Sequence, residues 1–62
     1  MQFQFKVDME NDAFATAHGK VDEIVRLLRK AAIEIENAAE IPTAHASLFD
    51  VNGNRCGWYR RA

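Results

Sequence analysis

The sequence has few of the residues that cross-link or sharply bend small folds: its 62 residues include one cysteine, one proline and three glycines. A lone Cys56 permits no internal disulfide and no cysteine-based metal cluster, so a compact core has to stabilise the chain without covalent cross-links. A domain this small buries only about 60% of the surface of its unfolded chain, which argues against a deep, enclosed catalytic cavity. We therefore expect one compact domain over residues 1–62.

Long apolar runs and a strong excess of one charge are also missing. No segment approaches the roughly 20 apolar residues that a membrane span needs, and MQFQFKVDME has neither the basic opening nor the apolar core of a signal peptide. We expect a cytoplasmic protein without a membrane partner. The net charge is −1, which argues against the broad basic surface of non-specific nucleic-acid binders.

Two apolar patterns of different period are present instead. In FQFKVDM, residues 3–9, apolar and polar residues alternate strictly, which predicts a half-buried strand. Farther along, apolar residues recur at the spacing of one helical face: Val21, Ile24, Val25, Leu28, Ala32, Ile35 and Ala39. This pattern predicts a helix whose buried face is centred on Leu28, with Leu27 on its flank.

The ends of this helix follow from local chemistry. The helix should begin between Thr16 and Lys20, because the Thr16 hydroxyl can cap free backbone amides. It should stop by Ala39 or Glu40, because Pro42 cannot extend a helix and disfavours helical geometry in the residue before it. The helix is therefore the longest predicted element.

A hairpin is predicted after the helix. Asn52-Gly53 stands between two apolar-rich runs, and both residues tolerate the positive φ angles of a two-residue type I′ turn. That turn sets the cross-strand pairs: Val51 with Asn54, Asp50 with Arg55, Phe49 with Cys56 and Ser47 with Trp58. The apolar and sulfur-containing members of these pairs then share the buried face of the sheet, whereas Asp50 and Arg55 are exposed.

Together the elements predict an α+β fold of two layers, in the chain order strand, helix, strand, strand. The helical connection makes the second strand run parallel to the first, and the hairpin makes the third strand antiparallel to both. Placing the third strand between the other two, the order 1-3-2, gives a mainly antiparallel three-stranded sheet packed on one helix.

The sequence contains no pattern typical of a catalytic or metal site. Cys56 should be buried beside Phe49, where a thiol packs as a small apolar group. His18 and His45 fall at opposite ends of this topology, which predicts no shared metal site. Ser47 lacks a histidine partner backed by a carboxylate. We expect no enzymatic activity and no cofactor.

Carboxylates gather at one end of the predicted fold, where the first strand ends, the helix begins and the hairpin turns. This acidic pole comprises Glu10, Asp12, Asp22, Glu23 and Asp50, with Lys20 and Arg55 nearby. A surface of this kind can attract a basic partner, and we predict these five acids as the partner-binding site. The simpler interpretation is that acids near a helix start complement its dipole and that the others aid solubility.

Acids are also found at the other end of the helix. Glu34, Glu36 and Glu40 oppose the helix dipole, which favours bases in the last turn. Lys30 can pair with Glu34, which lies four residues later on the same face. Helix stability alone does not explain the three acids.

The uncovered face of the sheet is a further candidate surface. With the predicted register it displays Gln4, Lys6, Asp8, Leu48, Asp50, Arg55, Tyr59 and Arg61. Aromatic and basic residues on an open sheet are typical of platforms for single-stranded nucleic acid. One tyrosine and two interleaved acids make a poor platform, so a solvated face is the preferred interpretation.

Three stretches carry a resemblance to known proteins: MENDAF after the first strand, EIVRLLRKAAIEIE in the helix and FDVNGNRCGWY in the hairpin. Through them, nearly the whole chain resembles small single-domain proteins of phages, prophages and plasmids, and within that group it is similar to anti-CRISPR inhibitors of type I effector complexes. The resemblance implies a non-enzymatic protein that binds the effector where DNA enters, with carboxylates in place of phosphates. The net charge of −1 limits such DNA mimicry to the acidic pole.

We therefore expect a monomeric protein inhibitor that presents the acidic pole to a basic nucleic-acid channel of a bacterial CRISPR effector and blocks DNA binding. Such an inhibitor would act in the host bacterial cytosol and would not bind nucleic acid itself. Two alternatives remain open. One is a small phage-type nucleic-acid-binding accessory protein that uses the open sheet face, and the other is an assembly factor that pairs through an edge strand.

Overall fold

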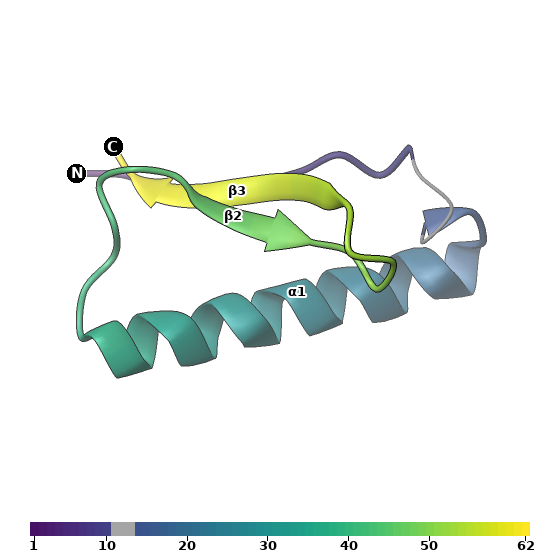
Figure 1. Cartoon of the computed structure of the whole chain (residues 1–62), viewed down its shortest axis with the longest axis horizontal. Helices are drawn as coiled ribbons and strands as arrows, with labels where there is room; N and C mark the ends of the chain where they lie inside the picture. Colours follow the sequence, from purple (N-terminus) through teal and green to yellow (C-terminus); the bar gives the residue numbers. More distant parts are fainter. Residues whose placement is uncertain (11–13) are drawn as a thin grey trace.

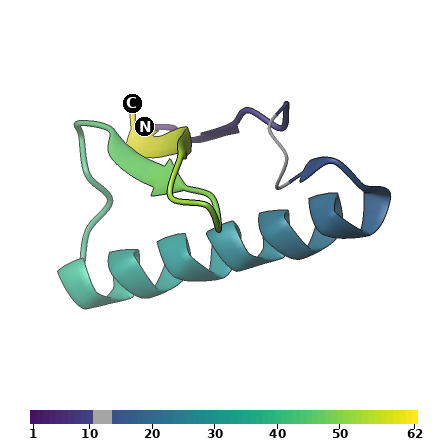
Figure 2. The same ribbon diagram turned by 45° about the vertical axis from the view of Figure 1, so that its right-hand side comes forward.

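The computed structural model describes residues 1–10 and 14–62, and its elements follow the predicted order. They are β1 (Phe3–Val7), α1 (Ala17–Ala38), β2 (Ala46–Phe49) and β3 (Arg55–Arg61). Strand β3 lies between β1 and β2 and is antiparallel to both. Helix α1 covers one face of this sheet and leaves the other face open (Figures 1 and 2). The two-layer α+β fold with strand order 1-3-2 is confirmed.

Helix α1 begins and ends where local chemistry predicts. Thr16 is its N-cap, and Thr16 Oγ1 accepts a hydrogen bond from the Gly19 backbone N–H at 2.8 Å. After Ala38, Ala39 adopts the left-handed region at φ 60°, and its N–H donates to the Glu36 carbonyl. Within the described residues, no helix is both long and apolar enough to cross a membrane.

The predicted buried face of α1 is wrong. Leu27 is fully buried, whereas Leu28 is 48% exposed. Ile24 and Ile35 pack partly against the core, but the rest of the predicted stripe is exposed: Val21, Val25, Leu28, Ala32 and Ala39. The helix therefore faces the sheet with the neighbouring stripe, which contains Leu27 and Ala31.

Two acids explain this difference. The stripe that faces the sheet includes Glu23 and Glu34, and both carboxylates accept hydrogen bonds from the hairpin. The Val51 N–H donates to Glu23 at 2.9 Å, and the Tyr59 hydroxyl donates to Glu34 at 3.0 Å. With these partners Glu23 is buried, whereas Glu34 stays exposed at the border of the sheet-facing stripe. Apolar periodicity passes over a stripe that contains acids and favours the adjacent apolar one.

The hairpin turn is longer than predicted. The Asp50 N–H donates to the Asn54 carbonyl at 2.9 Å, and the Gly53 N–H donates to the Asp50 carbonyl at 3.0 Å. Gly53 has a φ of 83°, whereas Asn52 does not have positive φ. The turn is thus a three-residue loop that a left-handed glycine closes, and not a type I′ turn. The predicted pairing of Val51 with Asn54 is wrong.

A bulge beside this loop changes which side chains face the helix. Ser47 pairs with Trp58 as predicted, but Phe49 pairs with Arg55 instead of Cys56. Cys56 is the extra residue of the bulge, and it is buried as predicted. Phe49 is 43% exposed and Trp58 is half-buried on the open side of the sheet, so their predicted burial under the helix is wrong.

The core is small and combines residues of α1, β2, β3 and the segment before the helix. Its buried members are Phe14, Leu27, Ala31, Leu48, Cys56 and Tyr59. Leu48 and Tyr59 are predicted on the open face, but both are buried under the helix. Val51 is predicted on the buried face, but it is 65% exposed. Phe14 precedes the helix in a segment without periodicity, so the sequence gives no signal of its burial.

Strands β1 and β3 approach each other closely at Gly57. Val7 is the residue that pairs with Gly57. A Cβ atom on Gly57 would collide with the backbone carbonyl of Lys6. Glycine at this position therefore allows β1 to complete the sheet.

Replacing Leu27 with alanine should lower the free energy of unfolding by about 2–5 kcal/mol, because it leaves a cavity at the centre of the core. Leu28→Ala should cost less than about 1 kcal/mol, since the Leu28 side chain is half-exposed. Chemical denaturation at low protein concentration measures both values. Equal losses for the two variants would contradict the observed rotation of α1.

Candidate functional site

The structure does not assemble the predicted acidic pole as one exposed surface. Glu23 is 4% exposed and Asp50 is 5% exposed, so both are buried. Glu10 and Asp22 are exposed, and Asp12 lies outside the described residues. Two of the five predicted partner-binding acids, Glu23 and Asp50, are therefore part of the interior of the fold.

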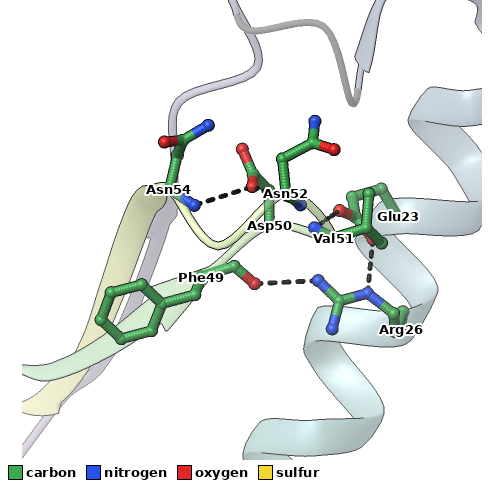
Figure 3. Close-up of polar contacts among 7 residues, drawn as sticks. All are labelled: Glu23, Arg26, Phe49, Asp50, Val51, Asn52 and Asn54. Atoms are coloured by element: carbon green, nitrogen blue, oxygen red, sulfur yellow. Dashed lines mark hydrogen bonds and ion pairs between the residues drawn. The ribbon is translucent and has the colours of Figure 1, made fainter.

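Glu23 fastens the hairpin to the helix. Its carboxylate accepts hydrogen bonds from Arg26 Nε at 2.5 Å and from the Val51 N–H at 2.9 Å (Figure 3). Arg26 Nη2 donates in turn to the Phe49 carbonyl at 2.8 Å. We call Glu23, Arg26 and these two backbone groups the hairpin clamp. The hydrogen bond from Arg26 lowers the pKa of Glu23 and outweighs the effect of burial, which raises it.

Asp50 organises the turn itself. Its Oδ1 accepts hydrogen bonds from the backbone N–H groups of Asn52 at 2.9 Å and Asn54 at 3.0 Å. This is the usual way in which an aspartate stabilises a tight loop. In the described part of the chain, Asp50 Oδ2 is buried without a hydrogen-bond partner. The role that the geometry gives to Asp50 is structural.

The exposed acids of the predicted pole have only local contacts. The Glu10 N–H donates to Asp8 Oδ1 at 3.1 Å. Asp22 lies 3.3 Å from His18 Nε2, and both side chains are well exposed. Within the described residues, the acidic pole is thus reduced to Glu10 and Asp22.

The face of the sheet away from α1 is the second candidate surface, and its residues differ from those predicted. Residues that pair across a sheet share a face. By this register, the open face displays Gln4, Lys6, Ser47, Phe49, Arg55, Trp58 and Arg60. The predicted members Leu48, Asp50 and Tyr59 are buried instead. Relative to the prediction, the open face therefore loses Asp50, has Trp58 in place of Tyr59 and has Arg60 in place of Arg61.

Trp58 is the centre of the open face. The His45 ring stacks on it with centroids 4.5 Å apart and planes 27° apart. The Arg60 guanidinium carbon lies 5.2 Å from the tryptophan centroid, and Arg60 Nε donates to Gln4 Oε1 at 2.8 Å. These contacts bring a second aromatic ring and a cation against the indole in the central strand.

Three bases surround the indole. Arg55 Nε donates to Ser47 Oγ at 3.2 Å, which holds its guanidinium over the sheet. In the residues that the structure describes, no carboxylate forms an ion pair with Lys6, Arg55 or Arg60. These three bases therefore form no direct ion pair in the described chain, and Asp8 is the one acid that lines the cavity with Lys6 and Arg55.

A shallow cavity of about 310 Å³ opens beside the bulge. Its lining consists of Lys6, Asp8, Arg55, Cys56, Gly57 and Trp58. Burial raises the pKa of the Cys56 thiol, so the thiol stays protonated and is a poor nucleophile. Among the described residues, no group of three histidine, cysteine or acidic side chains is arranged to hold a metal ion.

The clamp predicts an acid dependence of stability. Because the pKa of Glu23 is lower in the folded chain than its ordinary value of 4.5, the stabilisation is complete above that value and is lost as the pH falls through the folded pKa. Glu23→Gln should lower the free energy of unfolding at neutral pH by about 1–3 kcal/mol and should flatten this acid slope.

Glu10→Gln is the matched control, because Glu10 is exposed. Urea denaturation between pH 3 and pH 7, about the range in which carboxylates titrate, measures both slopes. An unchanged acid slope in Glu23→Gln would show that the clamp does not stabilise the fold.

The comparisons with known proteins add no assignment to this geometry. No protein-family model matches the chain, no curated protein matches its sequence and no solved structure matches its fold. The functional interpretation therefore rests on the open face and on the exposed acids.

Proposed function

We propose that the open face binds single-stranded nucleic acid, with a base stacked at Trp58 and phosphates held by Lys6, Arg55 and Arg60. The observation that carries this proposal is the placement of one tryptophan among three bases that have no acidic partner in the described chain. Proteins that bind single strands on open sheets combine aromatic stacking with a basic surround.

Stacking is the first requirement, and Trp58 is suited to it. The ring is half-buried and lies in the central strand β3, so its position is fixed by pairing on both sides. His45 and Arg60 already contact the ring, and both are side-chain types that stack on bases. A base can displace the exposed His45 ring or extend the stack beyond it.

Phosphate binding is the second requirement. Lys6, Arg55 and Arg60 come from two neighbouring strands, and the cavity beside Trp58 lies between the first two of them. Its volume is at the lower end of the range for small-ligand sites, about 300–1,000 Å³. Three phosphate contacts on a single strand give a slope of about −2 for the logarithm of affinity against the logarithm of salt concentration.

The protein-inhibitor hypothesis is the alternative proposal. It is supported by the exposure of Glu10 and Asp22, which can still meet a basic channel on a CRISPR effector. Its predicted surface no longer includes Glu23 and Asp50, because both side chains are buried. An inhibitor of this kind competes with DNA for its partner and does not bind DNA itself.

Fluorescence anisotropy with a labelled single-stranded oligonucleotide tests the proposal. The wild-type chain should bind at low salt, and Trp58→Ala should weaken binding by at least about tenfold, because stacking contributes about 1–3 kcal/mol per base. Lys6→Glu should also weaken binding and reduce the salt slope. Lys30→Glu is the matched control, because Lys30 is an exposed lysine on the helix.

Equal losses from Lys6→Glu and Lys30→Glu would show that any attraction is general and does not involve the open face. Absence of binding at low salt would contradict the proposal. If the chain instead displaced DNA from a CRISPR effector, and a Glu10/Asp22 charge reversal abolished that effect, the inhibitor hypothesis would replace it.

A further inference from the structure

One side of helix α1 carries an exposed apolar row that the fold does not use. This helix stripe consists of Val21, Val25, Leu28 and Ala32, which follow one another at intervals of three or four residues. Val21 is 62% exposed, Val25 is 41% exposed and Leu28 is 48% exposed. Side chains at this spacing lie on one continuous face of a helix.

The helix stripe lies on the flank of α1 that is away from β2. Arg26 reaches from the other flank to the Phe49 carbonyl of β2. Because successive residues turn by about 100° around the helix, Leu28 points nearly opposite Arg26, and Val25 lies about 100° away from it. Strand β1 is the edge of the sheet on that side. The exposure of Val21, Val25 and Leu28 shows that the sheet does not cover the stripe.

The charges of α1 are distributed unusually for an isolated helix. The first turn contains no acid and the last turn contains no base, although each would complement the dipole. Glu36 lies near the end of the helix and is exposed. Asp22, Arg29 and Glu36 follow the outer border of the helix stripe, away from the sheet.

We infer that two copies of the chain associate through their helix stripes, with the helices antiparallel about a two-fold axis. An axis that passes between Val25 and Leu28 brings Glu36 of each copy to the uncomplemented first turn of the other helix. It also brings Arg29 of each copy close to Asp22 of the other. A parallel pair would place Glu36 beside Glu36 and would align the helix dipoles unfavourably.

The dimensions of the molecule suit this contact. Helix α1 has 22 residues and is therefore about 33 Å long, and the longest extent of the molecule is 33 Å. An antiparallel pair can thus touch along the whole length of both copies, which favours an interface near the roughly 1,000 Å² that a specific complex needs. The pair uses no residue of the open face, so the inference does not depend on the proposed function.

The helix orientation predicted from the sequence buries this stripe, and a monomer is expected from the sequence. In the structure the stripe is exposed, so a second molecule is needed to bury it. The charges of Asp22, Arg29 and Glu36 along its border complement those of another copy of the same chain. Two copies also remove four apolar side chains each from water, which adds a hydrophobic contribution that the small core lacks.

Sedimentation equilibrium over a concentration series tests the association. The wild-type mass should rise from 7.0 kDa towards twice that value. Leu28→Glu should weaken dimerisation by at least about tenfold. Ile33→Glu is the matched control, because Ile33 is 59% exposed on the same helix but outside the stripe. Circular dichroism melts establish that both variants are folded.

A wild-type chain that stays at the monomer mass at every concentration would overturn the inference. Equal weakening by Leu28→Glu and Ile33→Glu would also overturn it, because the contact would then not be the stripe. Binding of a monomeric chain to phospholipid vesicles, with loss of binding in Leu28→Glu, would identify a lipid surface as the occupant instead.

Cysteine cross-linking tests the orientation separately. A mixture of His18→Cys and Glu36→Cys chains should form a disulfide-linked dimer on mild oxidation, and neither variant alone should do so. Cys56 is 4% exposed and should not compete. Cross-linking of Glu36→Cys by itself would show parallel helices and would contradict the antiparallel pair.

Discussion

The bulge at Cys56 is the constraint on which the two faces of the sheet depend. It adds one residue to β3 between the pairs Leu48 with Gly57 and Phe49 with Arg55. In a regular strand, Cys56 and Trp58 would share a face. The extra residue allows Cys56 and Tyr59 to be buried together under α1, and it leaves Trp58 on the open side. A change of one residue in the ladder therefore decides which side chains can meet a ligand.

Buried carboxylates complete this arrangement. An ionised acid in the interior is costly unless hydrogen bonds and a counter-charge satisfy it. Glu23 has both, from Arg26 and Val51, and Asp50 holds two N–H groups of its own turn. Because Glu23 and Glu34 face the sheet, α1 is turned so that Leu28 and its apolar neighbours are exposed. The rotation of the helix, the loss of the acidic pole and the helix stripe thus have one common cause.

The sequence predicts those features that depend on neighbouring residues. Thr16 caps the helix and Pro42 follows its end, and a central β3 is the placement that makes the sheet antiparallel throughout. The face of each element could not be predicted in the same way. It depends on contacts between residues far apart in the chain, such as Val51 with Glu23, and Glu23 is an acid that composition places on the surface but that the fold buries. Trp58 and Arg60 are two residues apart, as side chains on one face of a strand are. Cys56 is also two residues from Trp58 but is buried on the other face, and the bulge accounts for this difference.

Nuclear Overhauser spectroscopy of the free protein tests the face assignment most directly. The account predicts contacts from the Leu27 methyl groups to the side chains of Leu48 and Tyr59, which share the core with Leu27. It predicts contacts of the Trp58 indole with His45 and Arg60, and none with Leu27. Contacts between Trp58 and Leu27, together with an exposed Tyr59, would show that β3 lacks the bulge and that the open face is the one the sequence alone predicts.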